Sequence, residues 1–220
     1  MSRVLVLRPE PGASATVAKA REQGLDAAAV PLFEVEPIDW EAPEPSNFDG
    51  VLFTSANAVR HGGDKLKDYR GLQAYAVGQA TADEARDAGF GIASVGNSGV
   101  ARLLHSIDAD LRLLHLCGED RRDPEGAKQE ITTVAVYRSK PIEAPDLSCA
   151  NGAVALIHSP RAGARFAELI TEKGQTSIAA ISEAAAEAAG DGWARVEAAP
   201  EPTDDALLAL AARLCNKPVL

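Results

Sequence analysis

The polar residues that could do chemistry in this sequence come directly after short apolar runs. They are mostly hydroxyl and arginine side chains, with small residues at the turns: Arg8, Thr54, Ser55, Gly78, Gln79, Ala80, Thr81, Tyr137, Ser159, Arg161, Ser182 and Thr203. Several of them would be the first residues of helices, whose unpaired N–H groups and positive dipole end bind carboxylates or phosphates. This pattern predicts a site for an anionic small molecule.

The overall charge limits the possible partners. The chain has 22 Lys and Arg residues against 32 Asp and Glu, a formal net charge of -10. Nucleic-acid binding needs clustered basic residues to neutralise phosphates, so no nucleic-acid partner is expected. No apolar stretch approaches the roughly 18 residues of a membrane helix, so no membrane partner is expected either.

Three features of the sequence indicate whether the protein binds a metal and in which cellular compartment it works. They are the cysteines, the histidines and the first eight residues. Cys117, Cys149 and Cys215 contain no Cys-x-x-Cys pair, which favours neither a disulfide framework nor a zinc knuckle. The four histidines have no mutual spacing suited to a metal. Residues 1–8 hold too short an apolar run for a secretory signal. We expect a cytoplasmic protein without a metal.

The elements that must position the polar residues alternate along the chain. Short aliphatic runs are separated by alanine-rich segments of helical period, which is the pattern of βα units around a mainly parallel sheet. The predicted strands are residues 3–7, 27–31, 50–53, 74–77, 92–95, 111–116, 131–137, 154–158, 177–181 and 195–198. The clearest helices are predicted over 81–88 and after Thr203, where Asp204 and Asp205 oppose the positive end of the helix dipole.

Two halves of the chain resemble each other. Residues 51–58 (VLFTSANA) align with 155–162 (ALIHSPRA), and 77–83 (VGQATAD) align with 181–187 (ISEAAAE). A third pair of segments, 30–37 and 134–141, keeps the same separation of about a hundred residues, as block repetition requires. Ten strands are also many for one open sheet. We therefore predict two copies of one α/β domain rather than one large sheet with chance similarity.

The third pair predicts how the copies are joined. Both segments are extended and end in proline, so we predict that 30–37 and 134–141 form a two-stranded β linker. The first domain would be discontinuous, with residues 1–36 and 141–220, and residues 38–136 would form an inserted domain. Two open sheets facing each other across such a linker would place the carboxyl ends of their strands on the walls of a cleft.

In their order, these blocks resemble the uroporphyrinogen-III synthase family over essentially the whole chain. The matching blocks are residues 7–9 (LRP), 53–59 (FTSANAV), 77–82 (VGQATA), 136–137 (VY), 159–160 (SP) and 202–203 (PT). The resemblance implies two flavodoxin-like α/β domains with parallel sheets, joined by a β ladder, and an active site in the cleft between them. It implies an enzyme of haem biosynthesis that converts hydroxymethylbilane, a linear tetrapyrrole with acetate and propionate arms, to uroporphyrinogen III.

The implied reaction is a cyclisation with loss of water and inversion of the terminal ring, and it needs no cofactor. Loss of the hydroxyl leaves an azafulvene, which the terminal pyrrole attacks to give a spiro intermediate that fragments and recloses. By resemblance Tyr137 is the proton donor, since a phenol with a pKa of about 10 stays protonated at neutral pH. Other positions would bind the carboxylate arms: hydroxyls at Thr54, Ser55, Thr81, Ser159 and Thr203, counter-charges at Arg8 and Arg161.

Each assignment has an alternative. Ser and Thr residues at helix starts can be N-caps, the arginines can be solvated surface residues, and Tyr137 can simply end a buried strand. Residues 182–186 also depart from the family pattern, because relatives usually keep glycine and threonine there. The main functional alternative is therefore a degenerate member that binds a tetrapyrrole without converting it. A self-contained cleft gives no reason to require a second subunit, so we expect a monomer.

Overall fold

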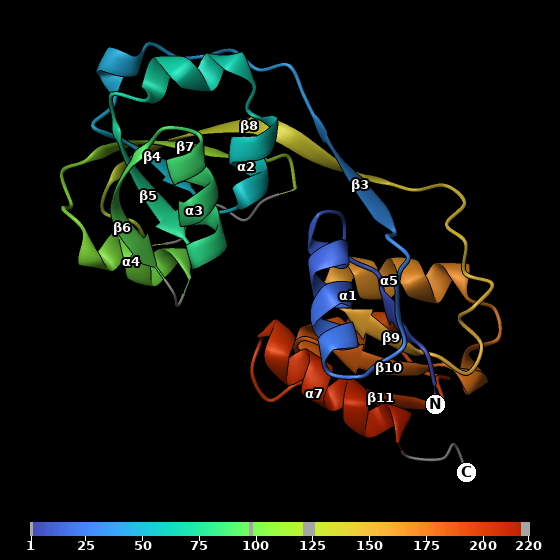
Figure 1. The fold of residues 1–220 in the computed structure, drawn as a ribbon. Coiled ribbons are helices and arrows are strands. Elements are labelled where there is room, and N and C mark those ends of the chain that lie inside the picture. Colours follow the sequence, from blue (N-terminus) through green and yellow to red (C-terminus); the bar gives the residue numbers. More distant parts are fainter. Residues whose placement is uncertain (1, 97–98, 121–125, 217–220) are drawn as a thin grey trace. The chain divides into compact units, whose positions relative to one another are not determined.

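The computed structural model of the chain describes residues 2–96, 99–120 and 126–216, which form two compact units (Figure 1). Unit 1 contains Met1–Glu34 and Pro141–Leu220, and unit 2 contains Val35–Lys140. Each unit is built around one sheet with helices packed against it. No helix within the described ranges has the length and apolar character needed to cross a membrane.

Unit 1 has a five-stranded sheet in the order β2-β1-β9-β10-β11, and all its strand pairs are parallel. Its strands are β1 (Val4–Val6), β2 (Ala27–Ala29), β9 (Val154–Ile157), β10 (Ser177–Ala180) and β11 (Arg195–Ala198). Its helices are α1 (Gly12–Glu22), α5 (Pro160–Leu169), α6 (Glu183–Ala189) and α7 (Asp204–Cys215), with a short 3₁₀ turn at Lys173–Gln175. Counted along the chain the strand order is 2-1-3-4-5, which is the flavodoxin-like order.

Unit 2 has the sheet order β3-β8-β7-β4-β5-β6. The strands are β3 (Phe33–Pro37), β4 (Gly50–Phe53), β5 (Gln73–Val77), β6 (Gly91–Gly96), β7 (Arg112–Gly118) and β8 (Glu130–Pro141). The helices are α2 (Ala56–His61), α3 (Gln79–Asp87) and α4 (Val100–Ser106), and 3₁₀ turns lie at Pro45–Asn47 and Asp64–Tyr69. The pairs β8-β7, β7-β4, β4-β5 and β5-β6 are all parallel.

The two sheets share one spatial arrangement. The repeated sequence blocks place β9 in the position of β4, and β10 in that of β5. Equivalent strands then occupy equivalent positions in the two sheets, in the orders β2-β1-β9-β10-β11 and β8-β7-β4-β5-β6. The chain begins each sheet at a different strand. When the five strands are numbered along the chain, their order across the sheet is 3-2-1-4-5 in unit 2, read from β6, and 2-1-3-4-5 in unit 1, read from β2, so the two units are circular permutations of each other. The predicted α/β class with two parallel sheets is confirmed. The circular permutation was not predicted from the sequence.

The chain passes between the units twice, after Glu34 and after Lys140. Both crossings lie in β3 and β8, which are neighbouring strands. Backbone hydrogen bonds from Ile38 N to Val136 O (3.2 Å) and from Ile142 N to Leu32 O (2.9 Å) run in the antiparallel sense. Only these two strands therefore carry the chain from one unit to the other.

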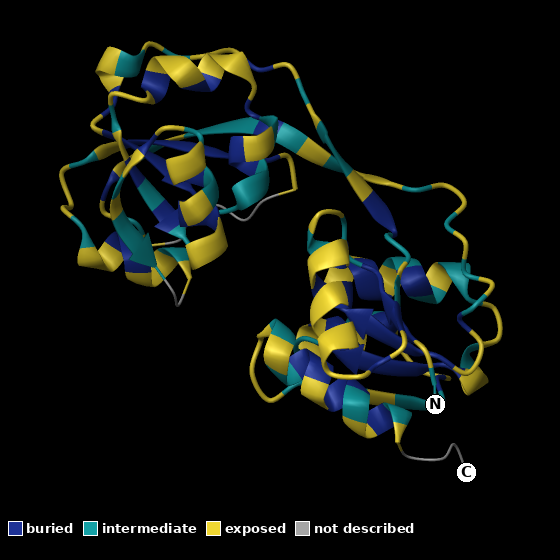
Figure 2. Ribbon diagram, in the orientation of Figure 1, coloured by how far each residue is buried: buried dark blue, intermediate teal, exposed yellow. Residues whose placement is uncertain are grey.

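The strand side chains alternate between the two faces of each sheet, as strand geometry requires. In β1, Val4 and Val6 pack with α7 residues such as Leu207, whereas Leu5 packs on the other face with Phe166 of α5. Figure 2 shows the central strands β1, β9 and β10 of unit 1 buried between helices whose outer faces are exposed. Both faces of the unit 1 sheet are thus covered, which explains why its central strands β1 and β9 are continuous apolar runs.

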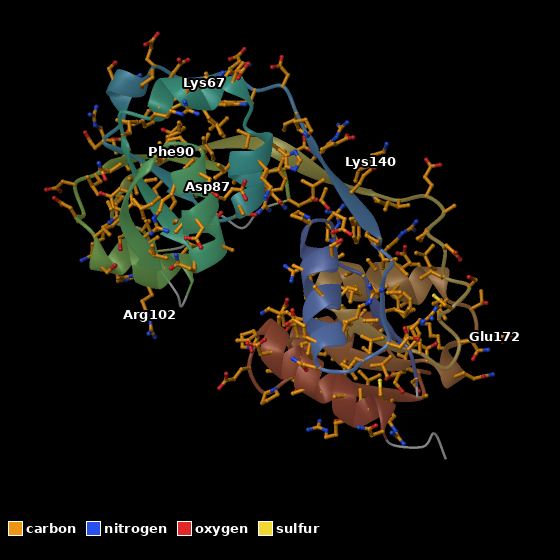
Figure 3. The ribbon with its side chains drawn as sticks, in the orientation of Figure 1. Lys67, Asp87, Phe90, Arg102, Lys140 and Glu172 are labelled. Carbon is orange, nitrogen blue, oxygen red and sulfur yellow. The ribbon has the colours of Figure 1, made fainter. Side chains whose placement is uncertain are left out.

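The predicted C-terminal helix is confirmed as α7, with a buried stripe of Leu207, Leu210, Ala211 and Leu214. The side chains in Figure 3 follow the same division between surface and core: Lys67, Arg102 and Glu172 are exposed, and Phe90 is buried with its ring 5.2 Å from that of Phe53.

Helices α5 and α6 pack closely against each other at Gly163. A Cβ atom on Gly163 of α5 would lie 2.7 Å from the carbonyl oxygen of Ala185 and 3.0 Å from the backbone nitrogen of Ala189, both in α6. Larger side chains at these contacts would push the helices apart. The close approach of α5 and α6 therefore requires a glycine at position 163.

Candidate active site

The strand ends of unit 2 bring several of the predicted residues together. The strand order reverses between β4 and β7, and open α/β sheets bind ligands beyond the carboxyl ends of the strands at such a point. Thr54 and Ser55 directly follow β4, and β7 ends at Gly118. Tyr137 on β8 pairs with Gly118. The predicted proton donor and two predicted hydroxyls therefore lie at the same edge of one sheet.

A β-bulge sets the direction of the Tyr137 side chain. Cys117 pairs with Ala135, but the next residue of β7, Gly118, pairs with Tyr137, so β8 has one extra residue at Val136. Bulges of this kind redirect side chains next to functional sites. Val136 is buried, whereas Tyr137 is only partly buried.

The phenol of Tyr137 has two polar neighbours. The Ser55 side chain lies close enough to lower the pKa of the phenol, and the ring of His61 lies with its centroid 6.2 Å from that of Tyr137 at an angle of 41°. The backbone N–H of Asn57 donates to Ser55 Oγ at 3.2 Å. Ser55 can therefore accept from the backbone and donate its own proton to the phenol oxygen. This arrangement leaves the phenol proton free to be donated to a ligand.

The protonation states suit proton donation. Burial raises the pKa of Tyr137, and the Ser55 side chain beside it offsets only part of this rise, so the pKa stays above 10.0. Burial, and to a lesser degree the charge of Arg60, lowers the pKa of His61 below 6.5. At pH 7 the site therefore contains a neutral phenol and a neutral imidazole.

The Thr54 hydroxyl contacts a buried histidine for which the sequence indicated no role other than metal binding, which the histidine spacing disfavours. Its Oγ1 lies 3.0 Å from Nε2 of His115, a β7 residue that is 1% exposed. This contact fixes the Thr54 hydroxyl at the end of β4. A histidine inside an apolar run was the signal that could have indicated it.

The turn at 78–81 begins helix α3 without a side-chain cap. Gly78 is the N-cap residue with φ 85°, a conformation that favours glycine, and it has no side chain to bond the first N–H groups of the helix. These groups remain available to an anion. Thr81, the third residue of the helix, is 5% exposed and does not cap it.

Replacing Thr81 with Val should therefore separate binding from stability. We expect turnover per folded molecule to fall about 10-fold, the low end for the loss of one hydrogen bond to a charged group, and the melting temperature to change little. A residue that acted only as a cap would instead lower the free energy of unfolding by about 1 kcal/mol and leave turnover unchanged. Parallel thermal melts and turnover measurements distinguish the two results.

The strand ends of unit 1 hold a polar cluster centred on Asp204, the first residue of α7. Arg8 Nη1 donates to both carboxylate oxygens, at 3.0 and 3.2 Å, and the hydroxyl of Thr16 donates to Oδ2 at 2.8 Å. His158 Nε2 lies 3.3 Å from Oδ1. Together, His158, the Thr16 hydroxyl and the positive charge of Arg8 hold the pKa of Asp204 far below its usual range.

This cluster changes the interpretation of Arg8. The sequence predicted Arg8 as a counter-charge for substrate, but its guanidinium already pairs with Asp204. The side chain also lies across Gly12, where a Cβ atom would be 2.6 Å from Arg8 Nε. Asp204 itself was predicted only to oppose the helix dipole, because its partners are far away in the sequence.

Four of the predicted hydroxyl residues are helix N-caps. Their side chains accept hydrogen bonds from backbone N–H groups at 3.2 to 3.3 Å: Ser55 from Asn57, Ser159 from Ala162, Ser182 from Ala185 and Thr203 from Ala206. The capping alternative is thus correct for these four. Capping uses the oxygen as an acceptor and leaves the hydroxyl proton free, so it does not prevent ligand binding. The guanidinium of Arg161 lies over the ring of Phe33, 4.5 Å from its centroid.

The fold and the strand ends define an α/β protein of two permuted parallel-sheet units with hydroxyl-bearing strand ends. Within the described ranges no group of three or more His, Cys, Asp or Glu residues could hold a metal ion. A family model described as uroporphyrinogen-III synthase HemD matches residues 14–209. The chain belongs to the uroporphyrinogen-III synthase family.

One curated protein is similar to part of the chain in sequence, and solved structures are similar to it in fold. A uroporphyrinogen-III synthase from Chlorobaculum parvum is 31% identical over an alignment of 101 residues, which covers 42% of this chain and 41% of that protein. The match therefore spans less than half of the relative's length. The fold is similar to that of uroporphyrinogen-III synthetase from Helicobacter pylori, with a TM-score of 0.69 and 18% identity over 97% of this chain and all of that one. A mutant uroporphyrinogen III synthase from Thermus thermophilus gives a TM-score of 0.55 and 16% identity over 99% of this chain and all of that one.

Proposed function

We propose that the protein is an active uroporphyrinogen-III synthase, a lyase that cyclises hydroxymethylbilane to uroporphyrinogen III with inversion of the terminal ring and loss of water. The observation that carries the proposal is the position and protonation state of the Tyr137 side chain. A protonated phenol, with Ser55 beside it, lies at the carboxyl edge of the unit 2 sheet. Family membership supplies the substrate class, a linear tetrapyrrole.

In the proposed reaction Tyr137 gives its proton to the departing hydroxyl, which leaves as water. The phenolate is stabilised for that moment by the hydroxyl of Ser55. The resulting azafulvene is attacked by the substituted carbon of the terminal pyrrole, and the spiro intermediate fragments and recloses with this ring reversed. The proton released when the last pyrrole regains its aromaticity returns to the phenolate. The enzyme is then restored without a cofactor.

The binding groups must hold a flexible chain in the geometry in which the substituted carbon reaches the electrophile. We assign the carboxylate arms to hydroxyls and backbone N–H groups at the strand ends: Thr54, Ser55, Gly78, Gln79, Ala80, Thr81, Ser159, Ser182 and Thr203, with Arg8 and Arg161 as cationic contributors. The uncapped start of α3 supports this assignment. Arg8 should contribute less than a free arginine would, because Asp204 already neutralises its charge.

Product identity tests the proposal. Purified protein is incubated with freshly made hydroxymethylbilane, and the type I and type III isomers are separated, with a protein-free sample as the control. The proposal expects the type III isomer in the protein sample and type I alone in the control. A degenerate member that only binds tetrapyrroles would give the isomer ratio of the control.

We further propose that the protein acts as a cytoplasmic monomer without nucleic-acid or membrane partners. Its described cysteines are all free thiols, as a reducing compartment allows.

A further inference from the structure

Gly118 has no backbone reason to be glycine. It is the last residue of β7, is buried, and is not among the glycines with positive φ. The left-handed conformation that favours glycine at Gly78 is therefore not the explanation here. An alanine could adopt the Gly118 backbone conformation.

The ring of Tyr137 supplies the reason. A Cβ atom on Gly118 would lie 2.8 Å from both Cε2 and Cζ of Tyr137, and 3.1 Å from its hydroxyl oxygen. Carbon atoms cannot approach to 2.8 Å without displacement, so any side chain at this position must move the ring. The phenol end of Tyr137 thus rests directly on the backbone of Gly118.

The contact involves the reactive end of the side chain. Ser55 lies near the phenol and the ring of His61 lies 6.2 Å from that of Tyr137, centroid to centroid, so a ring moved off Gly118 would change its position relative to both. The β-bulge between Cys117 and Gly118 fixes which residue of β8 faces the glycine. Reactions that depend on proton transfer lose rate when the donor moves by a fraction of an ångström to an ångström.

We propose that Gly118 is a positioning residue for the reaction: the absence of a side chain there sets the location of the Tyr137 phenol at the substrate. This inference rests on the proposed function, in which Tyr137 is the proton donor. Gly118 acts only through Tyr137, so its effect on rate should vanish when the phenol is absent.

The test is a double-mutant cycle with Gly118→Ala and Tyr137→Phe, measured as the rate of type III product per folded molecule. We expect Gly118→Ala to slow the parent about 3- to 10-fold and to have no further effect in the Tyr137→Phe background. The matched control is Gly50→Ala at the opposite end of β4, because a Cβ there would lie 2.6 Å from Cε2 of Tyr75. It should shift the melting temperature without changing the rate.

Three results would overturn the inference: an unchanged rate for folded Gly118→Ala, an equal slowing in both backgrounds, or the same slowing from Gly50→Ala. If Tyr137→Phe alone is as fast as the parent, Tyr137 is not the proton donor. The positioning role of Gly118, which depends on that donor, is then contradicted as well. Should Gly118→Ala not fold, His61→Ala is added to give the ring room. The combined variant should then be slower than His61→Ala alone, and equal rates would contradict the proposal.

Discussion

Tyr137→Phe is expected to slow formation of the type III isomer by about 10- to 100-fold with little change in the free energy of unfolding. The substitution keeps the ring against Gly118 and His61 and deletes only the proton donor. General acid catalysis is typically worth about 10²–10⁴-fold, and a water molecule can recover part of this. A hydroxyl that leaves readily needs less help, so the effect should lie at the lower end.

The matched control is Tyr75→Phe, which removes a phenol from β5 in the same unit and should leave the rate unchanged. The pH dependence gives a second measurement. Because the pKa of Tyr137 is raised above 10.0, the donor stays protonated through the neutral range, and the rate should fall only in alkaline solution above that value. Tyr137→Phe should lack this alkaline limb. If Tyr137→Phe matches the parent while Tyr137→Ala only destabilises the fold, the phenol is structural.

Asp204→Asn is expected to lower the free energy of unfolding of unit 1 by about 2–3 kcal/mol. The amide keeps the shape of the side chain but leaves Arg8 without its counter-charge, and it replaces the oxygen pair that accepts from Arg8 and Thr16. The carboxylate side chain is 22% exposed and that of Arg8 is 35% exposed, so solvent screening keeps the loss below that of a fully buried pair.

Urea unfolding at several pH values measures this effect. The pKa of Asp204 is lower in the folded state than the value of about 3.9 expected in the unfolded chain, so its contribution is present above pH 4. It is lost as the pH falls through the lowered folded value, and the difference between parent and variant should shrink there. The neighbouring Asp205, with a side chain 80% exposed, provides the control: Asp205→Asn should cost less than about 0.5 kcal/mol. A comparable loss from both variants would assign the effect to the helix dipole instead of the cluster.

Local patterns in the sequence were sufficient for most of the fold. The predicted strands at 50–53 and 195–198 coincide with β4 and β11, because turn residues or a change of period mark both of their ends. Strand β8 runs from Glu130 to Pro141, so the predicted strand 131–137 and the predicted linker segment 134–141 are parts of one continuous strand that pairs with β3. The permutation of the two sheets required the strand order, which no local pattern contains.

The candidate site was predictable in its residue types and less so in its contacts. Hydroxyls after apolar runs correctly indicated strand ends, and four of them are also caps. Two features could not be read from the sequence. The pairing of Arg8 with Asp204 joins residues almost two hundred positions apart, and the role of Gly118 depends on a bulge in the neighbouring strand.

The permuted order of the strands also determines when each sheet can be completed during synthesis. All five parallel strands of unit 2 lie within a continuous stretch of 92 residues, from Gly50 to Pro141. In contrast, β1 and β2 of unit 1 leave the ribosome first, but their central neighbour β9 follows only after the whole of unit 2. Pairing β1 with β9 closes a very long loop, and the entropy of closure rises with loop length. Once unit 2 is folded, β3 and β8 hold the two crossings of the chain side by side, so the loop that remains to be ordered is much shorter.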